Sequence, residues 1–304
     1  MFEAPRTIET TIFAKLPKKY HRTGKQTDWL KLQRRGENLH SFLEGPSFDR
    51  DGNLYVVDVP FGRIFRISPD GVFDLVIEYD GEPNGLKIHR DGRIFVADHK
   101  HGILLLDANR GVVSTIVDRT QLEDFKGPND LVFSSTGDLY FTDQGQTGLQ
   151  DPSGKVYRLR ADGKLEKLLD GIPSPNGIVL DLKETAILIA VTRGNCVWRA
   201  PMLLDGSVSK VGVFIQMTGG VGPDGMALDE AGNLAVCHPG MGTTWLFSAS
   251  GEPLYRIKSC ADNFPTNCAY GGLDRKSLFI VESHSGAILR AEMPTPGRLM
   301  FSHA

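Results

Sequence analysis

The sequence predicts an all-β protein, a six-bladed β-propeller whose four-stranded antiparallel blades surround a central channel. Three observations lead to this fold class: a strand motif that recurs six times, a further strand segment after each copy, and the lack of a convincing amphipathic helix. Repeats of about 40–50 residues built from short strands and turns are typical of propeller blades. Six such units therefore predict six blades.

The strand motif consists of a turn glycine, a short alternating strand and a polar residue six positions after the glycine. The four clear copies are DRDGNLYVVD at 49–58, HRDGRIFVAD at 89–98, SSTGDLYFTD at 134–143 and DEAGNLAVCH at 229–238. There are two weaker copies, LKETAILIAVT at 182–192 and LDRKSLFIVES at 273–283. Their polar end positions are Thr192 and Glu282. Alternation of apolar and polar residues predicts strands in all six units.

A third strand is expected after each copy, from segments such as GRIFRISPDG, GKVYRLRADG and GAILRAEM. No linker divides the chain, so residues 1–304 are expected to form one propeller domain. The segment TTIFAKL at 10–16 is placed to supply an outer strand to the last blade and to close the ring. A disordered leader over residues 1–8 is left open as an alternative.

Composition excludes several classes of function. With 40% hydrophobic and 23% charged residues and a net charge of −3, the chain resembles an ordinary globular protein and offers no basic surface for nucleic acid. No stretch approaches the length of an apolar membrane span. The four cysteines form no Cys-x-x-Cys pair, and the N-terminal segment has no secretory signal. Free thiols and a cytoplasmic location are therefore expected, with a Cys260–Cys268 disulfide as the alternative.

Aligning the six units on their polar end positions reveals a ring of residues at one level of the channel. We count back 14 residues from each end position, or 16 in the fourth unit, whose hairpin is longer by two residues. The ring then consists of Glu44, Asn84, Asn129, Asn176, Asp224 and Cys268. Each of these residues opens an innermost strand beside the channel. Pro-Asn-Gly and Pro-Asp-Gly are also turn sequences, but turn formation does not explain a Glu in the same slot.

The chemistry of the ring indicates a metal or ligand site. Two carboxylates and several neutral amides match the charge of one divalent cation, and oxygen ligands favour hard ions. Ca²⁺ is the expected ion, with Mg²⁺, Mn²⁺ and Zn²⁺ as the alternatives. A zinc site would use Cys268 with a nearby His, whereas the simpler interpretation of Cys268 is a small buried residue in the channel wall.

The ordered series EGP at 44–46, GPND at 127–130, SPNG at 174–177 and GPDGM at 222–226 resembles the SMP30/gluconolactonase/regucalcin-like family of six-bladed propellers. The resemblance covers about residues 40–292. It implies a catalytic divalent cation at one end of the channel, held by Glu44, Asn129, Asn176 and Asp224. In some members the third-blade Asn acts through the substrate or a water, which gives Asn129 a catalytic role as well.

The resemblance also implies hydrolysis of a small-molecule lactone. The cation would polarise the ester carbonyl and activate a water, with Asp224 as both ligand and general base. Candidate substrate-binding residues are Asn84, Asp130, His238 and His284. The structural alternatives are a turn carboxylate at Asp130 and hydrogen-bonded structural roles for the two histidines.

Two further expectations concern the blades and the substrate. Asp58, Asp98 and Asp143 are expected to brace blades through backbone hydrogen bonds, with a second structural calcium as the alternative. Sugar-lactone members commonly carry an Arg two residues before the third-blade Asn, where this chain has Gly127. This departure argues against an aldonolactone as the natural substrate.

Two other functions compete with lactone hydrolysis. One is phosphotriester hydrolysis on the same metal site, because similar propellers carry that activity. The other is a non-catalytic, NHL-like propeller scaffold that binds calcium or a protein. A scaffold gives no reason for acidic residues at only two of six equivalent positions, so the sequence favours an enzyme.

Overall fold

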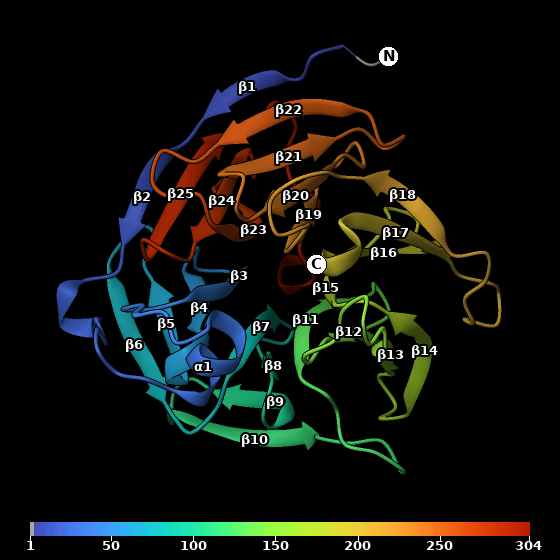
Figure 1. Cartoon of the computed structure of the whole chain (residues 1–304), viewed down its shortest axis with the longest axis horizontal. Helices are drawn as coiled ribbons and strands as arrows, with labels where there is room; N and C mark the ends of the chain where they lie inside the picture. Colours follow the sequence, from blue (N-terminus) through green and yellow to red (C-terminus); the bar gives the residue numbers. More distant parts are fainter. Residues whose placement is uncertain (1–2) are drawn as a thin grey trace.

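The structure, a computed structural model, describes residues 3–304 as six β-sheets arranged in a ring around a central channel (Figure 1). The inner strands β3, β7, β11, β15, β19 and β23 contact one another in this order, and β23 also contacts β3. The ring is therefore closed, and the predicted six-bladed propeller is confirmed.

Four blades are formed by strands that are consecutive in the sequence and follow one another from the channel outward. They are blade 1, with β3 (Leu43–Phe48), β4 (Leu54–Asp58), β5 (Arg63–Ile67) and β6 (Phe73–Glu78); blade 2, with β7 (Pro83–Ile88), β8 (Ile94–Asp98), β9 (Gly102–Asp107) and β10 (Val112–Val117); blade 3, with β11 (Pro128–Phe133), β12 (Leu139–Asp143), β13 (Gly154–Leu159) and β14 (Leu165–Ile172); and blade 4, with β15 (Pro175–Leu180), β16 (Ala186–Val191), β17 (Cys196–Pro201) and β18 (Gly212–Gln216).

The last two blades include strands from the N-terminal segment. They are blade 5, with β19 (Met226–Leu228), β20 (Leu234–His238), β21 (Thr243–Phe247), β22 (Pro253–Lys258) and β1 (Arg6–Glu9), and blade 6, with β23 (Pro265–Gly271), β24 (Ser277–Glu282), β25 (Ala287–Glu292) and β2 (Thr11–Lys15). Strand β2 pairs antiparallel with β25, so both ends of the propeller sequence meet in one sheet.

The alternative of a disordered leader over residues 1–8 is wrong for residues 6–8, which belong to β1. Arg6–Glu9 pair in parallel with Tyr255–Lys258, the outer strand of blade 5. This pairing satisfies backbone groups that an exposed edge strand would leave open. Met1 and Phe2 lie outside the described residues.

The sequence showed no convincing amphipathic helix, but the structure contains a short helix before the first blade. After the short turn η1 (Lys18–Tyr20), residues Asp28–Arg34 form helix α1, and the Thr27 hydroxyl accepts a hydrogen bond from Leu30 N–H at 3.3 Å. Only Trp29 and Leu30 of this helix are buried, and a seven-residue helix is too short to show a clear period in the sequence. Within residues 3–304, no helix has the length and apolar character needed to cross a membrane.

Acidic side chains at the ends of the second strands hold the start of the inner strands. The hydrogen bonds run from Phe42 N–H to Asp58 (2.7 Å), Glu82 N–H to Asp98 (3.0 Å), Gly127 N–H to Asp143 (2.7 Å) and Phe264 N–H to Glu282 (3.0 Å). The predicted bracing by the three aspartates is thus confirmed. In each case the contact holds the backbone two residues before the channel-end position.

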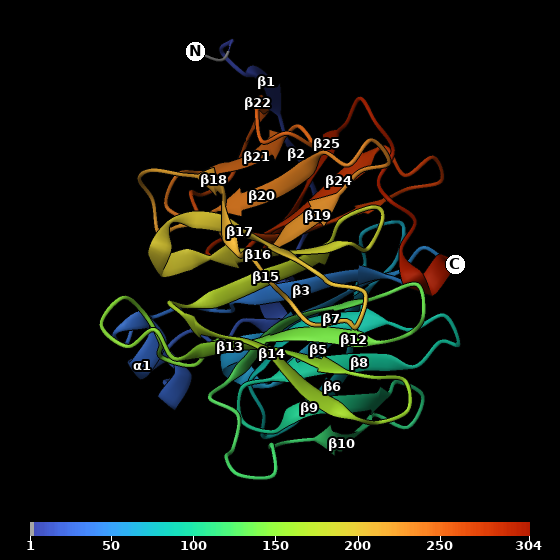
Figure 2. The ribbon, with the colours of Figure 1, turned by 90° about the vertical axis from the view of Figure 1, so that its right-hand side faces the viewer.

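The C-terminal segment covers the channel face opposite α1, as Figure 2 shows from the side. Arg298 donates to the Leu180 carbonyl at 2.9 Å, and the Phe301 ring of turn η4 (Phe301–His303) stacks 5.1 Å from the Phe133 ring. A cavity of about 180 Å³ with mostly apolar walls lies beneath this segment.

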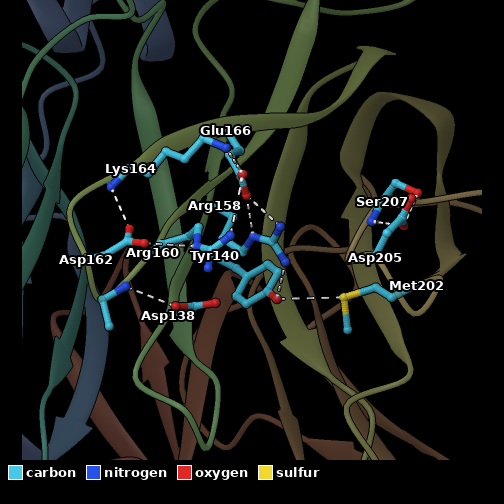
Figure 3. A network of polar contacts seen from close by, with 11 residues as sticks. Asp138, Tyr140, Arg158, Arg160, Asp162, Lys164, Glu166, Met202, Asp205 and Ser207 are labelled. Atoms are coloured by element: carbon cyan, nitrogen blue, oxygen red, sulfur yellow. Dashed lines mark hydrogen bonds and ion pairs between the residues drawn. The ribbon is translucent and has the colours of Figure 1, made fainter.

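A polar network on blade 3 connects this blade with blade 4 (Figure 3). The Arg158 guanidinium donates from Nε to Glu166 at 2.9 Å, and the Tyr140 hydroxyl contacts the Met202 sulfur at 3.7 Å. Hydrogen bonding to Lys164, followed by that to Arg158, lowers the pKa of Glu166 to about 2. None of these residues lines the channel end described below.

We expect Glu166→Gln to lower the free energy of unfolding at pH 7 by about 0.5–1 kcal/mol, because the ion pairs are partly solvated. A carboxyl with a lowered pKa in the folded state stabilises the protein above its unfolded pKa near 4.5, and this stabilisation is lost as the pH falls toward 2. Urea denaturation at pH 7 and pH 3 should show a smaller difference from the parent protein at pH 3. An equal difference in unfolding free energy at both pH values would contradict the lowered pKa of Glu166. Glu252→Gln, on an exposed turn, is the control.

Candidate active site

A cavity of about 450 Å³ opens at the channel end on the side of α1. Its walls combine residues at the starts of inner strands with side chains from α1 and the connecting loops. The residues that matter for the site are Trp29, Arg34, Phe42, Glu44, Asn84, His99, Asn129, Gln144, Asn176, Thr192, Arg193, Asp224 and Phe264.

Five of the six residues predicted as a ring line this cavity: Glu44, Asn84, Asn129, Asn176 and Asp224. They come from blades 1 to 5 in order. The first four side chains are buried, and Asp224 is partly exposed to the cavity. The register derived from the repeat therefore brings these side chains together around one space.

The prediction that Cys268 is the sixth residue of the ring is wrong. In blades 2 and 3 the proline that faces the strand-end carboxylate precedes it by 15 residues, whereas Pro265 precedes its partner Glu282 by 17. The hairpin of blade 6 is thus longer by two residues, and the equivalent position is Thr266. Cys268 instead lies in the apolar cavity at the opposite end of the channel. A zinc site that uses Cys268 is excluded by this separation. All four cysteines are free thiols.

The two carboxylates of the cavity wall lack a cationic partner at hydrogen-bond distance within residues 3–304. The Glu44 carboxylate accepts hydrogen bonds from Gly45 N–H at 2.9 Å and from Asn267 Nδ2 at 3.0 Å, which do not offset its burial. Burial raises the pKa of Glu44 to about 7. Burial, followed by the nearby charges of Glu44 and Asp130, raises the pKa of Asp224. The site thus disfavours two ionised carboxylates, and a bound cation would stabilise their ionised form.

The amide side chains are oriented by their own hydrogen bonds. Asn129 donates from Nδ2 to Gln144 Oε1 at 2.8 Å, and Gln144 donates in turn to the Ser174 hydroxyl at 2.9 Å. These two hydrogen bonds leave the Asn129 side-chain carbonyl oxygen as the atom able to accept a bond inside the cavity. Asn176 hydrogen-bonds to Asp224, a contact that acts to lower the pKa of that carboxyl.

The donor set suits a hard divalent cation. Two carboxylates without a counter-charge and amide oxygens from neighbouring blades are the ligands that calcium and magnesium accept. No group of three or more His, Cys, Asp or Glu side chains in residues 3–304 is arranged to hold a metal. An ion at this position would therefore need the amide oxygens of Asn129 and Asn176 in addition to Glu44 and Asp224.

Of the four predicted substrate-binding residues, only Asn84 lines the cavity. Asp130 is buried outside the lining, and its carboxylate accepts from Leu131 N–H at 2.8 Å. His238 uses both ring nitrogens, with Nε2 2.9 Å from the Gly219 carbonyl and Nδ1 accepting from Trp245 at 3.2 Å. Asp130 and His238 therefore lie outside the cavity lining, and their contacts fit the structural alternatives.

His284 is also behind the wall. Its ring stacks on Phe264 with centroids 4.1 Å apart, and its Nε2 accepts a hydrogen bond from Arg34 at 2.6 Å. Burial and the Arg34 charge lower the pKa of His284, in keeping with a neutral ring that accepts this bond. His284 thus acts on the cavity through Arg34 and Phe264.

Several residues of the wall were missed by sequence reasoning, notably Trp29, Arg34, Gln144 and Phe264, and Arg193 was only a low-ranked candidate of the fourth blade. The α1 residues lie outside the repeat, so no register could align them with the site. Gln144 and Arg193 directly follow the strand-end positions of blades 3 and 4. That shared placement is a signal that could have found them.

His99 explains why position 127 carries no side chain. A Cβ on Gly127 would lie 2.8 Å from His99 Cδ2, and the Gly127 φ of 149° disfavours other residues. Burial lowers the pKa of His99 to about 4, so the ring is neutral near pH 7. An arginine at position 127 would meet this ring, and the wall at this point differs in shape and charge from one that carries an arginine.

Six blades around a channel with an oxygen-lined cavity at one end define a β-propeller with a polar cavity at the end of its channel. The chain belongs to the SMP-30/gluconolactonase/LRE-like family, whose model matches residues 42–284. It is 32% identical over 244 residues to a lactonase, drp35, of Staphylococcus aureus strain MW2, covering 75% of this chain and 72% of the relative. It is 30% identical over 286 residues to a gluconolactonase of Zymomonas mobilis, covering 82% and 78%.

Solved structures agree with the fold. A calcium-binding protein, regucalcin, from Agrobacterium tumefaciens superposes with a TM-score of 0.78 at 20% identity, covering 99% of this chain and all of that chain. A gluconolactonase from Xanthomonas campestris gives a TM-score of 0.74 at 21% identity, with coverage of 97% and 99%.

Proposed function

We propose that this protein is a divalent-metal-dependent hydrolase that opens a lactone, with Glu44, Asn129, Asn176 and Asp224 as the residues that hold the cation. The observation that carries the proposal is the pair of uncompensated carboxylates, Glu44 and Asp224, in a cavity also lined by amide oxygens. The lactonase and gluconolactonase relatives support the reaction class. The calcium-binding neighbour supports Ca²⁺ as the first ion to test.

The chain's own residues supply orientation and proton transfer. Asp224 at the cavity surface accepts a proton from the attacking water through its carboxylate as the water oxygen bonds to the lactone carbonyl carbon. The ring C–O bond then breaks, and Asp224 returns the proton to the leaving alkoxide, which yields a hydroxy acid. A bound cation would supply Lewis-acid polarisation of the carbonyl. Asn129 is placed to position water or substrate, because its Nδ2 is held by Gln144.

Metal removal tests the proposal directly. A panel of γ- and δ-lactones should be hydrolysed in a pH-stat assay, and chelation should remove the activity by about a hundredfold or more. Adding back Ca²⁺, Mg²⁺, Mn²⁺ or Zn²⁺ singly should restore turnover with at least one ion and so identify it. Activity that persists after complete chelation would exclude the metal-dependent mechanism.

The competing functions are outcomes of the same experiment. Turnover of phosphotriesters without turnover of any lactone would favour the phosphotriesterase alternative on the same cavity. Calorimetric binding of a cation without any hydrolysis would favour a binding scaffold. The cytoplasmic location stays a prediction from cysteine usage and the N-terminal sequence.

A further inference from the structure

The charged side chains of the cavity wall are two arginines and two carboxylates. In the part of the chain that the structure describes, the charged side chains that line the cavity are Arg34, Glu44, Arg193 and Asp224. The neighbouring His99 is neutral near pH 7, because burial lowers its pKa to about 4. If a divalent cation offsets Glu44 and Asp224, the two arginines decide what other charge the cavity accepts.

Arg34 is already neutralised by the protein. Its Nη2 lies 2.8 Å from the Glu37 carboxylate and 2.6 Å from His284 Nε2, and its guanidinium lies 4.4 Å from the Phe264 ring centroid. Glu37 supplies the opposite charge, and the aromatic ring fixes the orientation of the guanidinium plane. Arg34 therefore contributes shape to the wall without a net charge that a ligand must match.

Arg193 has no such partner. No hydrogen bond or ion pair joins its side chain to another residue in the range 3–304, although its backbone is firmly held. It lies in the turn η3 (Thr192–Gly194), where Thr192 donates from N–H to the Ser174 carbonyl at 3.0 Å and from its hydroxyl to the Pro223 carbonyl at 2.8 Å. Its positive charge reaches Asp224 and acts to lower the pKa of that carboxyl, against the larger effect of burial.

Arg193 is exposed and lines the same cavity as Val221 and Pro239, which come from the loops of blade 5. A free guanidinium can bind a carboxylate through two parallel hydrogen bonds. One unmatched positive charge corresponds to a monoanion, whereas a phosphate dianion would leave negative charge unpaired.

We propose that the natural lactone carries a carboxylate substituent that binds the Arg193 guanidinium at the cavity rim, which makes Arg193 a specificity-determining residue. This inference rests on the proposed lactone hydrolysis for the identity of the reacting ring. Recognition of the carboxylate itself rests on Arg193 and on a cation that offsets Glu44 and Asp224, and it does not depend on turnover. The substrate is then a lactone with a free acid group, and its hydrolysis product is a hydroxy diacid.

The test compares two lactones that differ only in charge, γ-butyrolactone-γ-carboxylate and γ-butyrolactone-γ-carboxamide. In the presence of the activating cation, the parent protein should favour the carboxylate in kcat/KM by about tenfold or more, as expected for a charge-assisted pair. Arg193→Gln should raise KM for the carboxylate more than for the carboxamide, so that the ratio of the two kcat/KM values falls to about one. Arg193→Lys should restore part of the preference. The matched control is Arg199→Gln, an exposed arginine of the same blade that does not line the cavity.

Binding of lactams separates this inference from the proposed reaction. Pyroglutamate and pyroglutamamide cannot be hydrolysed as lactones and can be compared by saturation-transfer NMR in calcium buffer. If neither lactone turns over, binding of pyroglutamate that is lost in Arg193→Gln still supports carboxylate recognition. An equal loss for charged and neutral ligands in Arg193→Gln, or an equal effect of Arg199→Gln, would overturn it. Equal binding of pyroglutamate by the parent and by Arg193→Gln would overturn it as well.

Discussion

Asp224→Asn is expected to reduce kcat/KM for lactone hydrolysis by about a thousandfold or more. The amide cannot accept the proton of the attacking water, and it removes one of two negative charges that would hold the cation. The same substitution is expected to raise the melting temperature of the chelated protein by about 1–3 °C. The neutral side chain ends the repulsion between Asp224 and the buried Glu44 carboxylate, and sites kept for function are often destabilising.

The measurement combines steady-state kinetics with thermal unfolding in chelator and in calcium. Calcium should raise the melting temperature of the parent protein more than that of Asp224→Asn. Asp130→Asn is the control, because Asp130 is a buried carboxyl near the pair that does not line the cavity. If Asp130→Asn lost as much activity as Asp224→Asn, the assignment of the base would have to be revised.

Arg63→Ala is expected to destabilise the protein by about 3–5 kcal/mol, the largest stability effect that we predict. The Arg63 side chain is fully buried. It donates from Nε to Asp58 at 2.9 Å and from Nη1 to the Tyr20 carbonyl at 2.6 Å. Without the guanidinium, Asp58 becomes a buried carboxylate without a counter-charge, and the cost of that unpaired charge accounts for the effect.

Chemical denaturation of Arg63→Ala, Asp58→Asn and the double variant measures this coupling. The double variant should be less destabilised than the sum of the single variants, because neither partner then leaves an unpaired charge. Asp58 also accepts from Phe42 N–H, two residues before Glu44, so Arg63→Ala should weaken cation binding as well. A loss below about 1 kcal/mol would show that the pair is replaced by water or by relaxation of the backbone.

The repeat in the sequence was enough to predict six blades and the five cavity residues Glu44, Asn84, Asn129, Asn176 and Asp224. Strand alternation and hairpin length are local properties, and a known hairpin length is enough to find the same channel level in each blade. The same argument failed at Cys268 because the hairpin of blade 6 has two more residues, a difference that shows only when Pro265 is seen to face Glu282.

Only the tertiary structure decided what surrounds the predicted ring. Trp29 and Arg34 reach the cavity because α1 packs over its mouth, and His284 is held behind the wall by Phe264 and Arg34. The contact between Arg34 and His284 joins residues 250 positions apart in sequence, and no local pattern records it. The lack of a charged partner for Arg193 is likewise visible only in the tertiary structure. The sequence by itself determined which residues face the channel. Which of them carry a charge without a partner was decided by the tertiary structure. Burial and ion pairing depend on neighbours that only the folded chain brings together.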